Sequence, residues 1–352
     1  MKIAVYSICK NEINFINRWY NSMKEADEIY VLDTGSNDNS IELLKSLGVN
    51  VKEEKIDPWR FDVARNKGLE MVNDDVDICV CTDLDEVFEK GWRKKLEETF
   101  KKGITRVKYN YNWYIEDDIP KVSFLYDKIH LRHGYRWIYP VHEILVYDGI
   151  ENVVINEEIV LNHYPDRNKS RSSYLNLLKL SVKENKDNER HLHYLGREYM
   201  YYNKNELAIK TLYKHLNVAK WDLEKSASMR FIGRCYLNLG RIKEAELWYN
   251  EAINLTPDLR DAYVELAFLK MKESKYKDVI KLCNKALKIK TKNKYYINEI
   301  FSWDHTIYDM LSIAYFYEGN YKKALSFINK ALKMTDDKRI KKNKDLIKKA
   351  LL

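Results

Sequence analysis

The spacing of apolar residues changes near residue 170 of this 352-residue chain, and this change constrains the fold more than any other feature. Before it, short apolar runs alternate with amphipathic stretches and clusters of turn residues, a pattern typical of strands alternating with helices. After it, glycine and proline become rare and apolar residues recur at helical spacing. We therefore predict an α/β domain over residues 1–170, a linker helix over 171–189 and an all-helical domain over 190–352.

The net charge of +8 is divided unevenly between the two halves. Residues 1–170 hold 24 Lys and Arg against 31 Asp and Glu, a net charge of −7. Residues 171–352 hold 37 against 22, a net charge of +15. Such an asymmetry indicates two domains with different partners. A basic half can meet nucleic acid, an acidic protein or a membrane surface, and a simple need for solubility explains it equally well.

Several features concern the compartment in which the chain works. No run of about 18 apolar residues occurs, so no membrane span is predicted. The first residues, MKIAVYSICKNE, are charged too soon for a signal peptide and read as a strand. The cysteines match no zinc spacing and are expected to be reduced thiols, which fits the cytoplasm. These are Cys9, Cys79, Cys81, Cys235 and Cys283.

The first half reads as strands and helices in alternation, which predicts a parallel sheet with right-handed crossovers. Ligands of such sheets bind beyond the carboxyl ends of the strands, so the residues that follow each strand are the informative ones. The predicted strands cover 3–8, 28–33, 49–54 and 76–82, and the predicted helices cover 13–25, 41–48 and 62–72.

Acidic residues stand at two of these strand ends. Asp33 ends the second strand, and Asp83, Leu84 and Asp85 follow the fourth. Two carboxylates separated by one residue can bind Mg²⁺ or Mn²⁺, although the same triplet is often only a solvated turn. The chain has no GxxxxGK[ST] and no GxGxxG, which argues against a P-loop ATPase and a classical dinucleotide-binding fold.

A series of short motifs runs through about residues 1–170. The earlier motifs are SICKNE (7–12), VLDTGSNDNS (31–40), WRFDVARNKG (59–68) and CTDLDE (81–86), and the later ones are RWIYPVHE (136–143) and LNHYPD (161–166). The earlier motifs resemble those of the family 2 glycosyltransferases, which have the GT-A fold. The later motifs are similar to the branch of that family that carries tetratricopeptide repeats, which includes peptide S-glycosyltransferases related to the sublancin enzyme.

The resemblance implies a role for each matching residue. It implies a nucleotide sugar, with UDP-hexose or UDP-HexNAc the expected donor, and a metal ion, Mn²⁺ or Mg²⁺. Asp85 is the expected direct metal ligand, with Asp83 and His163 completing the set. The residues expected to bind the nucleotide sugar are Ile8, Asn11, Glu12, Asp33, Asp62, Arg65, Asp83 and Leu84.

Transfer with inversion needs a base that takes the proton of the acceptor. Glu143 is the first candidate and His142 the second. The alternative is that His142 is structural or binds metal while Glu143 pairs with Arg136.

Aromatic residues supply a further candidate surface. Trp113 and Trp137 lie in aromatic-rich segments, and aromatic faces stack on sugar rings. Packing in strands and core explains them equally well.

The second half carries internal repeats. The tetratricopeptide pattern is clearest over 233–257, and the same register recurs at 196, 233, 267 and 312. The longer last interval implies an insertion of 11 residues around 291–303. We count four repeats followed by a basic capping helix over 338–349.

Stacked repeats of this kind commonly bind extended peptides in a groove. A basic groove favours an acidic or Ser/Thr-rich acceptor. Tyr194, Arg197, Tyr201, Arg230 and Arg234 are candidates to line it. The leading hypothesis is therefore an inverting, metal-dependent glycosyltransferase with a protein or peptide acceptor, and self-association through the repeats is an additional possibility.

Three other functions remain open from the sequence. The first is transfer to a cell-envelope glycan or lipid, and the second is an inactive scaffold. The third, a nucleic-acid-modifying enzyme, has no recognition motif in its support.

Overall fold

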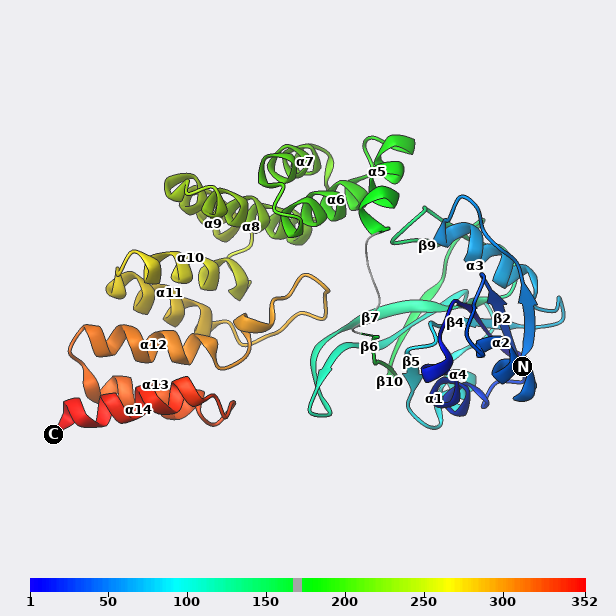
Figure 1. Cartoon of the computed structure of the whole chain (residues 1–352), viewed down its shortest axis with the longest axis horizontal. Helices are drawn as coiled ribbons and strands as arrows, with labels where there is room; N and C mark the ends of the chain where they lie inside the picture. Colours follow the sequence, from blue (N-terminus) through cyan, green and yellow to red (C-terminus); the bar gives the residue numbers. More distant parts are fainter. Residues whose placement is uncertain (167–172) are drawn as a thin grey trace. The chain divides into compact units, whose positions relative to one another are not determined.

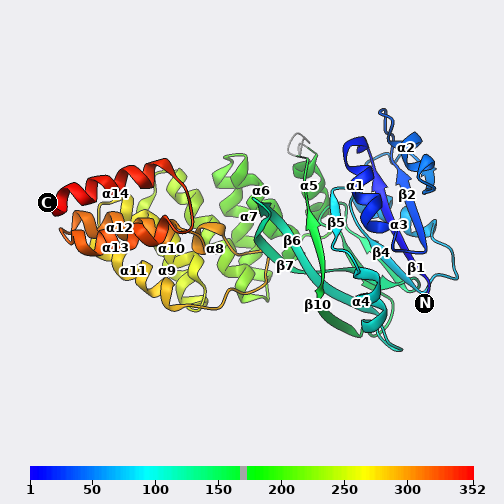
Figure 2. The ribbon, with the colours of Figure 1, turned by 90° about the horizontal axis from the view of Figure 1, so that it is seen from below.

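The computed structural model of the protein describes residues 1–166 and 173–352. The chain divides into two compact units, Met1–Ser181 with Lys294–Tyr296, and Val182–Asn293 with Ile297–Leu352. The first unit contains the strands and the second is helical (Figures 1 and 2). The predicted fold class, an α/β domain followed by an all-α repeat domain, is confirmed.

The first unit is built around an eight-stranded sheet with the order β3-β2-β1-β4-β7-β6-β10-β5. A separate two-stranded ribbon pairs β8 with β9. The strands are β1 (Ile3–Cys9), β2 (Glu28–Asp33), β3 (Asn50–Glu53), β4 (Ile78–Cys81), β5 (Glu86–Phe88), β6 (Arg106–Glu116), β7 (Ile119–Leu131), β8 (Tyr135–Ile138), β9 (Ile144–Tyr147) and β10 (Val153–His163).

The first four strands pair in parallel, with β1 between β2 and β4. This arrangement follows from the helices between the strands, because a parallel pair needs a crossover connection. The sheet then continues with the antiparallel pairs β4–β7 and β7–β6. The carboxyl ends of β1, β2 and β4 consequently meet at one edge, at Cys9, Asp33 and Cys81.

Both faces of β1, in the middle of the parallel part, are buried. Ile3 and Val5 of β1 join a core cluster with α1 and α4, while Ala4 and Tyr6 join a second cluster on the opposite face with α3. This explains why β1 reads as a continuous apolar run. The helices of this unit are α1 (Ile13–Met23), α2 (Ser40–Ser46), α3 (Phe61–Glu70), α4 (Trp92–Thr99) and α5 (Tyr174–Glu184), the last of which extends into the second unit.

The second unit is a series of helical hairpins. The four repeat registers at 196, 233, 267 and 312 fall in α6, α8, α10 and α12, the first helix of each hairpin. The helices are α6 (Glu189–Tyr201), α7 (Asn205–Val218), α8 (Asp222–Asn238), α9 (Ile242–Leu255), α10 (Arg260–Lys272), α11 (Tyr276–Lys288), α12 (Thr306–Tyr317), α13 (Tyr321–Ala331) and α14 (Lys338–Leu351).

Two glycines permit close packing inside these hairpins. A Cβ atom at Gly233 would lie 2.6 Å from the Tyr249 ring, and one at Gly196 would lie 2.5 Å from the Leu212 side chain. Real Cβ atoms do not approach other atoms this closely. The α6–α7 and α8–α9 hairpins therefore pack closely where a side chain is missing from the first helix.

The basic C-terminal helix α14 covers the last hairpin. Ile340 and Ile347 are buried in one cluster with Ala324 and Ile328 of α13. The lysines of α14 occupy its remaining surface, as expected of a capping helix. Among the described residues, no helix combines the length and apolar character needed to cross a membrane.

Candidate active site

The segments that follow β1 and β2 are tied together by side chains predicted to bind the nucleotide. The Asp33 carboxylate accepts from the backbone N–H groups of Gly35 and Ser36, at 2.9 and 2.8 Å. The Ser36 hydroxyl donates to Asp33 and accepts from the Asn11 N–H at 2.8 Å. The Asn11 side chain in turn accepts from the Asn37 N–H at 2.8 Å. The structure thus brings Asn11 and Asp33 to one place.

Neighbouring positions of the first motif complete this region. The Glu12 backbone N–H donates to the Ser40 hydroxyl at 2.9 Å. Ile8 packs against a small core cluster that includes Leu32 and Ala64. Asp62 is bound by Arg60, with its two oxygens 3.0 and 2.8 Å from the guanidinium nitrogens. Ile8, Glu12 and Asp62, which the sequence predicted to bind the nucleotide sugar, therefore contact other residues of the first unit.

Arg65 joins three segments that are far apart in the sequence. Its side chain is 5 % exposed and projects from α3. The Nε atom donates to Glu143 Oε1 at 2.5 Å, and Nη2 donates to Asp83 Oδ1 at 2.9 Å. A buried guanidinium has to be paired in this way, because an unpaired charge costs several kcal/mol. Arg65, Asp83 and Glu143 therefore form one cluster at the carboxyl end of β4.

Lys128 of β7 adds a second cation to this cluster. It is 4 % exposed, and its ammonium lies 3.3 Å from Asp83 Oδ2 and 4.8 Å from the centre of the Tyr126 ring. Burial alone would raise the pKa of the Asp83 carboxyl, but Arg65 and Lys128 hold it well below its usual range. Asp83 is therefore ionised and already balanced by two cations.

Glu86, the last residue of the CTDLDE motif, is buried and binds the backbone of that motif through its carboxylate. Its carboxylate accepts from the Asp83 N–H and from the Tyr111 hydroxyl, both at 2.8 Å. Burial raises the pKa of Glu86, Lys128 opposes this, and the nearby Asp83 and Asp85 carboxylates add to the rise. Glu86 thus fixes the position of the turn in which Asp83 and Asp85 stand.

Among the predicted metal ligands, Asp85 and His163 lie close enough together to share a metal ion. Asp85 Oδ2 lies 3.3 Å from His163 Nε2, and the His163 Nδ1 atom lies 2.9 Å from the Trp113 carbonyl oxygen. That carbonyl can only accept, so Nδ1 carries the proton and Nε2 faces the carboxylate. A carboxylate oxygen next to an imidazole nitrogen is a donor set that suits Mn²⁺, and here a hydrogen bond at the other ring nitrogen fixes the orientation of the imidazole. Asp83 differs, because both of its oxygens face cations.

The two candidate bases occupy different surroundings. Glu143 is largely buried, with 10 % of its side chain exposed, and pairs with Arg65. The alternative pairing with Arg136 is not found, because Arg136 is bound to Asp148. His142 stands at a backbone φ of 50°, and its ring lies 5.9 Å from that of Tyr174 in α5. Glu143 is therefore the candidate that belongs to the Arg65 cluster.

Two predicted contacts, those of Trp137 and Leu84, need correction or restriction. Trp137 is 3 % exposed and its indole N–H donates to the Tyr6 hydroxyl, so it is a core residue with no free face for a sugar. Leu84 is 2 % exposed in the main core, so only its backbone can reach a ligand. Trp113 is 46 % exposed on β6 and stays available for stacking.

Sequence reasoning missed Lys128 and Tyr111 and gave Glu86 no role of its own. Glu86 ends the CTDLDE motif and could have been chosen on that ground. Lys128 carried a usable signal as well, since a lysine within an apolar strand is rarely buried without an acidic partner. Nothing in the spacing of Tyr111 indicated that its hydroxyl would reach Glu86.

The repeat residues predicted to line a groove have mixed surroundings. Tyr201 is 58 % exposed, whereas Arg230 is only 2 % exposed. Arg230 and Arg234 both pair with Glu265 and Glu299. These two arginines are consequently not free cations on an open surface.

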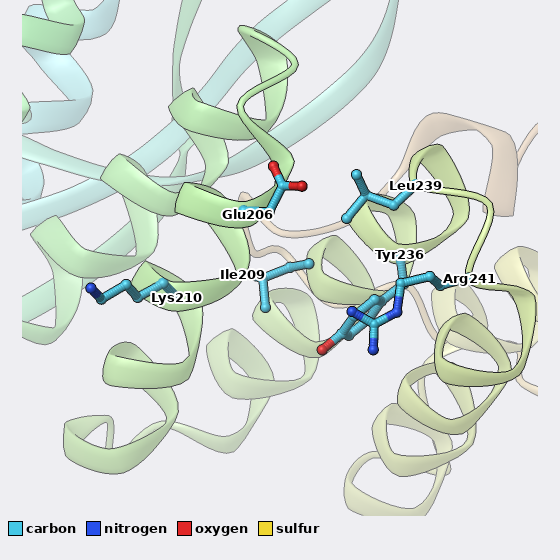
Figure 3. Close-up of a pocket in the computed structure, with 6 residues that line it drawn as sticks. All are labelled: Glu206, Ile209, Lys210, Tyr236, Leu239 and Arg241. Atoms are coloured by element: carbon cyan, nitrogen blue, oxygen red, sulfur yellow. The ribbon is translucent and has the colours of Figure 1, made fainter.

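A separate pocket of about 380 Å³ lies in the first two hairpins (Figure 3). It contains none of the predicted site residues. Arg241 lies over the Tyr236 ring there, 4.6 Å from its centre, and pairs with Glu244. The residues that line the pocket are Glu206, Ile209, Lys210, Tyr236, Leu239 and Arg241.

Comparison with known families agrees with this division of the chain. Residues 5–133 match the model of glycosyl transferase family 2, and residues 231–259 and 305–338 match a tetratricopeptide repeat model. The first match supports glycosyltransferase activity, and the second supports interaction with proteins. A search of curated proteins found no match to the chain.

Solved structures similar to this chain include repeat proteins. A structure of MamA is 20 % identical, with 46 % of this chain and 81 % of that chain covered and a TM-score of 0.37. PilF of Pseudomonas aeruginosa is 13 % identical, with coverages of 47 % and 69 % and a TM-score of 0.39. YrrB, described as a TPR protein with an unusual peptide-binding site, is 14 % identical, with coverages of 48 % and 80 % and a TM-score of 0.36.

Proposed function

We propose that the protein is an inverting, metal-dependent glycosyltransferase that moves a sugar from a UDP-sugar to a protein or peptide acceptor. The observation that carries this proposal is the cluster at the end of β4. Arg65, Asp83 and Glu143 come from three separate motifs and are in direct contact there. Asp85 and His163 stand next to it in the chain and the sheet.

The charges of the cluster suit a donor that arrives with a metal ion. Asp83, Asp85 and Glu143 provide three carboxylates, against the two cations of Arg65 and Lys128. A nucleotide diphosphate adds further negative charge, which this set cannot balance alone.

Asp85 and His163 are the residues we expect to hold Mn²⁺ or Mg²⁺. The bound ion supplies positive charge as the bond to the leaving diphosphate breaks. On the protein side, Asp33 and Asn11 shape the loops that we expect to receive the nucleotide.

On the acceptor side, Glu143 is the proposed base. As the acceptor atom bonds to the anomeric carbon, its proton passes to the Glu143 carboxylate and the UDP group leaves from the opposite side of the sugar. Arg65 occupies Oε1 of Glu143 and fixes the direction of the carboxylate. The second oxygen is the one we assign to the acceptor. His142 is the alternative base.

The helical repeats are the part we assign to acceptor selection. Tetratricopeptide arrays present helical surfaces to other chains, and this array carries most of the positive charge of the protein. Positive charge also increases the rate of encounter with acidic partners.

The proposal is tested with purified protein and a nucleotide sugar. Incubation with UDP-glucose or UDP-GlcNAc and Mn²⁺, without acceptor, should release UDP slowly. Asp85→Ala should reduce the metal-dependent rate at least tenfold, because the ion loses its carboxylate ligand. The matched control is Asp74→Ala, since the Asp74 side chain is 90 % exposed and lies outside the cluster.

Two outcomes would contradict the proposal. If neither donor binds or is hydrolysed, the chain is better explained as an inactive repeat scaffold. If Asp85→Ala keeps the full metal-dependent rate, the metal site lies elsewhere.

A further inference from the structure

Part of the insertion between α11 and α12 packs against the first helices of two earlier repeats. This part, Ile297–Trp303, belongs to the helical unit and includes one short 3₁₀ turn, η1 (Ile300–Ser302). We call this part the strap. It is within the orange loop that precedes α12 in Figure 1. The strap contacts residues of α8 and α10, the first helices of two successive repeats.

The polar contacts of the strap involve its main chain and one carboxylate. Arg230 of α8 donates to the Ile297 carbonyl at 2.9 Å and to Glu299 Oε1 at 3.3 Å. Arg234 also binds Glu299, and the Glu299 N–H donates to Asp261 of α10 at 2.8 Å. The repeat helices thus recognise both the backbone and the side chain of one acidic residue.

Glu299 completes the charge balance of this surface. Arg230 and Arg234 also share Glu265 of α10, whose side chain is 4 % exposed. Without Glu299, two arginines would face a single carboxylate. Burial alone would raise the pKa of Glu299, but the charges of Arg234 and Arg230 outweigh it and lower the pKa below its usual value. The group is therefore held as a carboxylate. This surface therefore requires an anion.

Aromatic residues on the C-terminal side of Glu299 complete the contact. The Phe301 ring lies 5.4 Å from that of Phe268 in α10. The Trp303 ring lies under the Arg260 guanidinium, 3.8 Å from its centre, and Arg260 also donates to the Ser302 carbonyl at 3.1 Å. The recognised pattern is therefore an acidic residue followed two and four residues later by aromatic ones.

We propose that the surface of α8 and α10 is a binding site for a peptide segment of another protein with the pattern Glu-x-aromatic, and that the strap occupies this site as an internal ligand. The identity of that segment as part of the acceptor rests on the proposed function. A tethered ligand competes at a high effective concentration, commonly in the millimolar range. A partner consequently binds only when it displaces the strap with better contacts or when the strap is weakened.

The test uses a fluorescent peptide of the strap sequence, Tyr-Ile-Asn-Glu-Ile-Phe-Ser-Trp-Asp, and the full-length protein. In the variant Glu299→Gln/Phe301→Ala the strap loses its anion and one aromatic ring. Fluorescence anisotropy should show that the peptide binds this variant at least tenfold more tightly than it binds the wild type. A peptide with Gln in place of Glu should bind at least tenfold more weakly to that variant. Glu318→Gln, a change at an exposed position, is the matched control and should bind as the wild type does.

Equal peptide affinity for wild type and strap variant, or equal affinity of the Glu and Gln peptides, would overturn the proposal. If the double variant is unfolded by circular dichroism, Glu299→Gln alone is used, since it keeps the shape of the side chain. The peptide affinities of Glu299→Gln and of the wild type are then compared in the same way, with the same expected difference. Release of UDP is measured on the same samples. Peptide binding without UDP release would contradict the proposed enzyme and leave the binding site supported.

Discussion

At the scale of single residues, Arg65 of the candidate site pairs with two carboxylates at once, those of Asp83 and Glu143. Arg65→Met would leave Asp83 and Glu143 with one fewer cation in a largely buried place. Removing one partner of a buried ion pair typically costs about 3–5 kcal/mol of unfolding free energy. Urea unfolding measures this loss. Arg136→Met is the control, because that side chain is 55 % exposed and should change stability by less than about 1 kcal/mol.

Glu143 permits a sharper test of the chemistry. Glu143→Gln keeps the shape and a hydrogen-bond acceptor for Arg65 but cannot take a proton from the acceptor. Transfer to a protein acceptor should slow by about 10²–10⁴-fold while binding of the UDP-sugar is retained. Isothermal titration of the donor and single-turnover transfer separate the two effects. Unchanged transfer in Glu143→Gln, together with a loss in His142→Gln, would move the base to His142.

At the scale of elements, the two hairpin glycines have a mechanical role that can be isolated. Gly233→Ala places a methyl group 2.6 Å from the Tyr249 ring, so either this buried ring or helix α9 has to shift. Overpacking of this kind typically costs about 1–3 kcal/mol.

The matched control for this change is Gly68→Ala. Gly68 lies inside α3, where a Cβ atom would meet nothing closer than 3.7 Å. Alanine favours a helix by about 1 kcal/mol over glycine, so this variant should be neutral or more stable. Thermal unfolding followed by circular dichroism compares the two variants. Equal effects would show that hairpin closure does not depend on Gly233.

At the scale of the whole molecule, buried neutral histidines predict sensitivity to mild acid. Burial lowers the pKa of His130 and of His193 to about 3, from an ordinary value of 6.5. The unfolded chain therefore binds more protons than the folded chain below pH 6.5. Stability is complete above that pH and decreases as the pH falls toward 3, by about 1.4 kcal/mol per pH unit for each histidine.

Urea unfolding at pH 7.5, 6.0 and 5.0 tests this dependence. The slope should become smaller in His130→Asn and in His193→Asn, since each removes one titrating group. These histidines lie in different units, so their effects should be additive. The dependence would not come from these two histidines if the change of unfolding free energy between pH 6.5 and 5 were the same in the wild type and in both variants.

The sequence alone determined the first four strands, the helices between them and the repeat register of the second half, but not the strands that follow residue 82. Apolar runs of β1 and β4, the turn cluster after β2 and the repeated register at Gly196 and Gly233 are local patterns, and each reports which faces of a segment are buried. The motif order also identified Arg65, Asp83 and Glu143 as candidates. These inferences succeed because the spacing of side chains along a helix or strand depends only on neighbouring residues.

Only the tertiary structure decided which of those side chains meet. The contact of Arg65 with Asp83 and Glu143 spans 18 and 78 residues, and Lys128 joins them from β7. The burial of Trp137 and the position of Glu299 between Arg230 and Arg234 were likewise decided by packing. The physical reason is that such pairings depend on the register of strands and the placement of an insertion, to which distant segments contribute and which no local spacing encodes.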